Sequence, residues 1–187
     1  MEHLGTKRME TERLILRPFV MEDADAMFRN WASDPAVTRY MTWPTYEKKE
    51  TADLILSQWT ASYKDPGFYQ WAIELKSIGE AIGSISVVFH NDKICSAHMG
   101  YCIGSQWWGQ GIMTEALRTV MDFLFDEVGF NRVEAMHDTN NPASGAVMRK
   151  CGMKQEGIFR QYIRSNLGIG DASMYALLAS DRKGVAE

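Results

Sequence analysis

A glycine-containing loop at residues 106–115, Gln-Trp-Trp-Gly-Gln-Gly-Ile-Met-Thr-Glu, is the feature that most constrains the fold. An apolar run precedes it and a long amphipathic stretch follows it. This order predicts a strand, a turn with Gly109 and Gly111, and the start of a helix. Free backbone N–H groups at the positive end of a helix suit a phosphate. The loop therefore predicts a site for a phosphate-bearing cofactor, and an ordinary glycine turn is the alternative interpretation.

Two common classes of glycine-rich nucleotide loop do not match this segment. A Walker A loop ends in Gly-Lys-Ser or Gly-Lys-Thr, whereas Ile112 and Met113 follow Gly111 here. A dinucleotide loop has a third glycine where this chain has Thr114, and it lies in an N-terminal βαβ unit. This segment lies past the middle of the chain, so both nucleotide classes are disfavoured.

The size and charge of the chain favour one globular domain over residues 1–187. The sequence is 45% hydrophobic with a formal net charge of −4, so we expect no nucleic-acid partner. The first residues carry no apolar segment, and no apolar run approaches the ~18 residues of a membrane span. We therefore expect a cytoplasmic protein with no membrane partner. Cysteines 95, 102 and 151 have neither disulfide nor zinc spacing, so we expect reduced thiols and no metal.

Apolar periodicity predicts an α+β fold. The predicted strands cover residues 13–17, 68–75, 82–89, 97–103, 132–137, 153–160 and 172–179, with a loop at 167–170. The predicted helices cover residues 21–33, 47–63, 111–128 and 142–151, with one more helical turn at 35–40. Neighbouring strands joined by short turns predict an antiparallel meander. We expect a mixed, mostly antiparallel central sheet with helices on both faces.

Several short segments occur in an order that resembles one known family. Trp108-Gly109-Gln110-Gly111 resembles the coenzyme A pyrophosphate motif of the GNAT acetyltransferases. The flanking residues are similar to the Rim-type branch, which includes ribosomal-protein N-terminal alanine acetyltransferases. These flanking segments are residues 11–17, 34–40, 99–101, 114–116, 141–144, 150–153 and 156–157. The resemblance covers about residues 11–180 as the core of the domain and implies a GNAT-like fold with acetyl-CoA as cofactor.

The resemblance implies an N-acetyltransferase that moves the acetyl group directly to a primary amine in a ternary complex. Such a reaction needs a neutral amine, a polarised thioester carbonyl and a proton for the leaving thiolate. The acceptor stays open between a protein N-terminus and a small-molecule amine, and the family suggests a homodimer. Two residues that are frequent in the family are missing here, so a non-catalytic acyl-CoA-binding or partner-binding module is the alternative hypothesis.

The resemblance also implies which residues hold the coenzyme. Cys102 and Ile103 are the expected backbone donors to the thioester carbonyl, because the family's matching strand splays from its neighbour. A fully paired strand is the alternative. Asn141 is expected to bind the pantetheine arm, although it also suits a helix cap. The expected loop residues are Gln106, Gly109, Gln110, Gly111, Ile112, Met113 and Thr114.

His98 is the candidate general base. It occupies the position of a glutamate in many family members, and an imidazole with a pKa near ~6.5 can accept an amine proton. A hydrogen-bonded histidine of the strand is the alternative. The glutamate that some relatives use on the following strand corresponds to Met136, and the nearby reserves are Glu134, His137 and Asp138.

Ser144 is the candidate proton donor to the sulfur. Many family members use a tyrosine at the position of Met148, whereas the resembling branch points to Ser144. A purely capping role at the start of a helix is the alternative for Ser144.

Aromatic residues could line a pocket for the acceptor, with core packing as the alternative, above all for Trp31 and Trp59. The candidates are Trp31, Tyr40, Trp43, Tyr46, Trp59 and Trp71.

Overall fold

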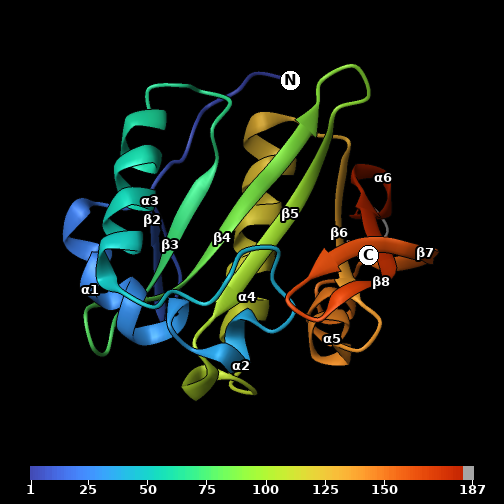
Figure 1. The fold of residues 1–187 in the computed structure, drawn as a ribbon. Coiled ribbons are helices and arrows are strands. Elements are labelled where there is room, and N and C mark those ends of the chain that lie inside the picture. The colour runs from blue at the N-terminus through green and yellow to red at the C-terminus, as the bar shows by residue number, and fades with distance from the viewer. Residues whose placement is uncertain (183–187) are drawn as a thin grey trace.

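The structure, a computed structural model, describes residues 1–182 and joins eight strands in one sheet (Figure 1). The strand order is β1-β2-β3-β4-β5-β6-β8-β7. The strands are β1 Met9–Glu10, β2 Leu14–Arg17, β3 Gln70–Leu75, β4 Glu80–Asn91, β5 Ser96–Ile103, β6 Arg132–Asp138, β7 Lys154–Ser165 and β8 Gly168–Leu178. Adjacent strands are antiparallel except β5 and β6, which are parallel. The predicted mixed, mostly antiparallel sheet is confirmed.

Helices cover both faces of this sheet, as predicted. The regular helices are α1 Ala24–Met27, α2 Pro35–Thr38, α3 Lys49–Ser62, α4 Ile112–Phe123, α5 Pro142–Lys150 and α6 Ala179–Arg182. The 3-10 and π turns are η1 Met21–Asp23, η2 Phe28–Ala32, η3 Ser105–Trp107 and η4 Leu124–Val128. The helices α1 and α3 pack on one face, and α4 and α5 pack on the other. Within residues 1–182, no helix has the length and apolar character needed to cross a membrane.

Side-chain alternation along the strands separates two cores. In β3, Trp71 and Ile73 are fully buried against residues of α4, including Leu117. Ala72, between them, belongs to the other core, which contains Trp31. Because successive side chains of a strand point to opposite faces, one six-residue strand serves both layers.

The structure differs from the sequence prediction in four segments. The predicted helix at 21–33 is a 3-10 turn, an α-turn and a π-turn in succession. Both strands of the last hairpin are longer than predicted, and glycines 168 and 170, predicted to lie in a loop, pair within β8. Glycine lacks a side chain to show alternation, so the pattern concealed these positions. The short elements β1 and α6 were not predicted because they span too few residues for a period.

The parallel pair β5–β6 separates partway along its length. Pairing runs only as far as Met99↔Ala135, although β5 continues to Ile103 and β6 to Asp138. The N–H of Gly104 donates to the carbonyl of Ile82 in β4 at 2.9 Å. Backbone groups alternate in direction along a strand, so every second N–H of β5 before Gly104 also faces β4. The others face β6, and those beyond Met99 face the opening between β5 and β6.

Candidate active site

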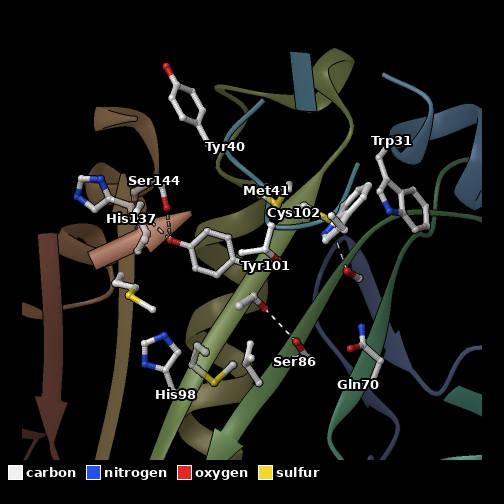
Figure 2. Close-up of a pocket in the computed structure, with 18 of the residues that line it drawn as sticks. Trp31, Tyr40, Met41, Gln70, Ser86, His98, Tyr101, Cys102, His137 and Ser144 are labelled. Carbon is white, nitrogen blue, oxygen red and sulfur yellow. Dashed lines mark hydrogen bonds between the residues drawn. The ribbon is translucent and has the colours of Figure 1, made fainter. Parts of the chain in front are cut away.

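A cavity of about 460 Å³ lies where β5 and β6 separate (Figure 2). The strands β5 and β6, the start of α5 and the segments around α1 to α3 contribute its walls. Four residues predicted from the sequence to act in catalysis or coenzyme binding line it together: His98, Cys102, Asn141 and Ser144. The fold therefore gathers side chains that are up to 46 positions apart in the sequence.

Tyr101 of β5 contacts Ser144 across this cavity. The Tyr101 hydroxyl lies 3.0 Å from Ser144 Oγ and 3.1 Å from the Ser144 carbonyl oxygen, which accepts its proton (Figure 2). Burial raises the pKa of Tyr101, and the bond to Ser144 opposes this only in part. The phenol therefore keeps its proton at physiological pH.

Tyr101 is not among the site residues predicted from the sequence. In the sequence, Tyr101 stands out only as part of the segment 99–101, which resembles the family. The tyrosine that many family members use corresponds to Met148 in this chain. Met148 is a buried core residue in α5.

His98 is buried in the wall of the same cavity, with 4% of its surface exposed. Its Nδ1 lies 3.4 Å from Oε1 of Glu134, and its ring stacks on Phe89 at 4.6 Å between centroids. Burial lowers the pKa of His98, and the carboxylate of Glu134 offsets this only in part. The imidazole is therefore uncharged at neutral pH and can accept a proton.

The reserve groups on β6 are less available than His98. Nδ1 of His137 donates to the Asp138 carbonyl oxygen at 2.8 Å, and its Nε2 is buried without a hydrogen-bond partner among residues 1–182. The Asp138 carboxylate accepts from the backbone and the side chain of Asn140 at 2.8 and 2.9 Å. Glu134 accepts from Arg132 Nε at 2.7 Å as well as facing His98.

Two N–H groups of β5 face the opening in the sheet. The alternation set by Gly104 turns the N–H of Tyr101 and Ile103 toward the gap and that of Cys102 toward β4. The predicted direction of the Ile103 N–H agrees with this placement, whereas the other N–H that faces the gap belongs to Tyr101 and not to Cys102. The Cys102 thiol is itself buried near Ser84, and burial raises its pKa.

The glycine loop follows β5 directly and presents a row of unused backbone donors. Gly109 and Gly111 have φ angles of 74° and 76°, a left-handed conformation that favours glycine. Within the described part of the chain, the N–H groups of residues 109–114 have no hydrogen-bond partner, and the first N–H bonded in α4 is that of Glu115. Six donors at the positive end of a helix fit the pyrophosphate of a coenzyme.

Side-chain hydrogen bonds and an ion pair stabilise the conformation of this loop. Gln110 Nε2 donates to the Gln106 carbonyl oxygen at 3.0 Å, and Arg13 donates to the Gln110 carbonyl oxygen at 2.9 Å. Arg13 also pairs with Glu115 in the first turn of α4. Ile112 and Met113 are buried, so only their backbone faces a ligand.

Asn141 occupies the N-cap position of α5 but makes no side-chain capping bond. Its backbone carbonyl accepts from the Ser144 N–H at 3.2 Å. Because its side chain lines the cavity, its amide can serve a ligand.

The aromatic residues divide between the cavity and the opposite core. Five of the six candidates line the cavity: Trp31, Tyr40, Trp43, Tyr46 and Trp59. Trp71 does not, since the alternation of β3 directs it to the α4 side, where its indole donates to the Lys7 carbonyl oxygen at 2.7 Å. The proposal that Trp71 lines the acceptor pocket is wrong.

Comparisons with known proteins agree with this architecture. Residues 13–154 match the family model "Acetyltransferase (GNAT) domain". The chain is 32% identical over 170 residues to the uncharacterized N-acetyltransferase YoaA of Bacillus subtilis, covering 91% of this chain and 96% of that protein. It is 26% identical to the ribosomal protein uS5 alanine N-acetyltransferase of Escherichia coli, covering 83% and 82%.

A solved structure of the ribosomal L7/L12 α-N-protein acetyltransferase RimL, in complex with coenzyme A, has the same fold. It superposes with a TM-score of 0.83 at 21% identity, covering 94% of this chain and 99% of that one. The family match spans well over half of the chain, and the sequence resemblance is confirmed. The chain belongs to the GNAT acetyltransferases, a family of enzymes that use acetyl-CoA as the acetyl donor.

Proposed function

We propose that this enzyme transfers the acetyl group of acetyl-CoA directly to a primary amine, with both substrates bound together. The observation that carries the proposal is the continuity of β5 with the glycine loop. The gap of the sheet and the row of free N–H groups of residues 109–114 lie at the same end of this strand. A coenzyme bound at the loop would reach the cavity along β5. The relative solved with coenzyme A supports the same donor.

The coenzyme supplies an activated acyl thioester, and the protein supplies the donors that hold and polarise it. The N–H groups of residues 109–114 hold the pyrophosphate, and the amide of Asn141 holds the pantetheine arm. The N–H groups of Tyr101 and Ile103 face the place where a carbonyl oxygen gains negative charge. Removing one such donor typically costs about 10²–10³-fold in rate.

Two side chains transfer protons in the proposed reaction, one as a base and one as an acid. Neutral His98 accepts the proton of the attacking amine, directly or through water, at its imidazole. The Tyr101 hydroxyl, held by Ser144, delivers a proton to the leaving sulfur. Ser144 orients the phenol. The sequence predicted Ser144 itself as the proton donor, whereas in this proposal Tyr101 donates the proton and Ser144 positions it.

The walls of the cavity favour an acceptor with an apolar body beside its amine. Trp31, Trp43 and Met41 are among its aromatic and aliphatic lining residues. The carboxylate in the lining is Asp138, and Asn140 already occupies it. A polyamine would find few negative charges here, whereas an apolar amine or a peptide N-terminus with apolar side chains would be well packed.

Replacing Gly111 by aspartate is expected to lower acetyl-CoA affinity at least 100-fold in calorimetry. The substitution places a carboxylate beside the pyrophosphate donors and a side chain at a left-handed backbone position. Gly111→Asn is the matched control, because asparagine tolerates this conformation without the charge and is expected to lose less than about tenfold. Equal affinity in wild type and Gly111→Asp would disprove the loop site.

His98→Ala is expected to lower kcat/KM for the amine by about 10²–10⁴-fold while the KM for acetyl-CoA stays unchanged. The wild-type kcat/KM falls as pH drops through the His98 pKa, which burial holds below 6.5. Above that pKa the imidazole is neutral, so His98 causes no further change of kcat/KM with pH. In His98→Ala, kcat/KM no longer falls as the pH drops through this range (the acidic limb of the profile). Added imidazole is expected to restore part of the kcat/KM of the variant. An unchanged acidic limb in His98→Ala would assign the base elsewhere.

Tyr101→Phe is expected to lower kcat more than Ser144→Ala does. The phenylalanine keeps the ring packing but removes the hydroxyl, whereas Ser144→Ala leaves the bond from Tyr101 to the Ser144 carbonyl intact. We expect losses in kcat of about 10²-fold for Tyr101→Phe and about tenfold or less for Ser144→Ala. The reverse order would transfer the proton-donor role to the Ser144 hydroxyl.

A coenzyme-release assay over an amine panel tests the function as a whole. Apolar primary amines and peptides with an apolar N-terminal residue are expected to give a higher kcat/KM than spermidine. Mass spectrometry of the product should show one acetyl group on nitrogen. Tight acetyl-CoA binding without release on any amine would refute the proposed transfer, and a preference for spermidine would refute the apolar acceptor.

A further inference from the structure

Three side chains outside the catalytic cavity place potential metal ligands together. They are His3, His90 and Asp92, and one ligand atom from each lies within 4.8 Å of the others. We propose that this cluster binds a zinc ion, with the free coordination position taken by water. The spacing of the cysteines predicts no metal, and no local motif joins these three side chains. His3 and His90 are 87 positions apart and meet only in the folded chain.

Both histidines lie within hydrogen-bond distance of one oxygen of Asp92. His3 Nε2 lies 3.2 Å from Oδ1 of Asp92, and His90 Nδ1 lies 2.7 Å from the same oxygen. Zinc ligands at about 2.0–2.2 Å from the ion lie about 3.3 Å from one another in a tetrahedron. Small side-chain rotations would therefore admit the ion among these three atoms. Two imidazoles and one carboxylate form a donor set that zinc accepts.

The second ring nitrogen of His3 also has a hydrogen-bond partner, and such a contact orients a metal-binding histidine. His3 Nδ1 lies 2.9 Å from the hydroxyl of Tyr69, a residue that is 1% exposed. With the ion on Nε2, the imidazole proton of His3 resides on Nδ1 and is donated to the Tyr69 oxygen. The two imidazole rings lie 4.4 Å apart, and both pack near Phe130, so their positions are constrained.

The proposed site lies away from the coenzyme loop. His90 is near the end of β4, Asp92 is in the turn that follows this strand, and His3 belongs to the segment before β1. Figure 1 shows the N-terminus beside the tip of the β4–β5 hairpin, whereas the glycine loop follows the other end of β5. The side chains of His3, His90 and Asp92 are 18%, 29% and 56% exposed, so an ion could enter from solvent. A bound ion would fasten the N-terminal segment to the hairpin.

Calorimetric titration of the untagged, chelator-treated protein with zinc chloride tests the proposal. One ion per chain is expected to bind, and His3→Ala and His90→Ala should each weaken binding at least tenfold. Tyr69→Phe should weaken it by about tenfold or more, because the supporting hydrogen bond is lost. Zinc should raise the Tm of the wild type and leave that of His3→Ala unchanged.

Cys95→Ser and His137→Gln are the controls for other zinc ligands. Cys95 follows Asp92 by three residues, and its thiol lies 3.5 Å from the Asp92 carbonyl oxygen. Both controls should bind zinc with the wild-type affinity, and circular dichroism of the metal-free variants should match the wild type. Failure to bind one ion, unchanged affinity in His3→Ala and His90→Ala, or loss of binding in Cys95→Ser would overturn the site. Asp92→Asn should retain the wild-type acetyl-transfer rate without metal and lose zinc binding at least tenfold.

Discussion

The separation of the one parallel strand pair determines where every part of the candidate active site lies. Parallel neighbours require a crossover, and here α4 with η4 makes that crossover between β5 and β6. The positive end of α4 consequently comes to the same edge of the sheet at which β5 leaves β6. Had the two strands stayed paired to their ends, the N–H groups of Tyr101 and Ile103 would be consumed by the sheet, and no cavity would separate β5 from α5.

Desolvation in that gap acts on two groups in opposite directions and leaves both uncharged. Burial lowers the pKa of His98 and raises the pKa of Tyr101, because in each case it penalises the charged form. The result is an uncharged imidazole and an uncharged phenol on the walls of one cavity at the same pH. Neighbouring polar groups, Glu134 for the histidine and Ser144 for the phenol, temper the effect and fix the orientation of each side chain.

Much of this arrangement could be read from the sequence, and the remainder depended on contacts that no local pattern records. The strong periods of α4 and β3, and the glycines at 109 and 111, predicted the layers and the glycine turn that precedes α4. The role of Tyr101 could not be predicted, because its partner Ser144 lies 43 positions away on another element. The predicted directions of the Cys102 N–H and of the Trp71 side chain were wrong. Neighbouring residues of a strand point in opposite directions, so these directions depend on the pairing register, which the sequence does not reveal.

The bond between Arg13 and the Gln110 carbonyl spans 97 positions of the chain. The glycine loop is therefore not stabilised by local contacts alone. It also accepts a hydrogen bond from Arg13, the residue that precedes β2. Contacts of such long sequence separation carry a loop-closure cost and tend to form late in folding. The glycine loop should therefore reach its final conformation only after the first and central strands have come together. A shorter fragment that begins after β2 would carry the whole glycine motif but lack the guanidinium that holds it in shape.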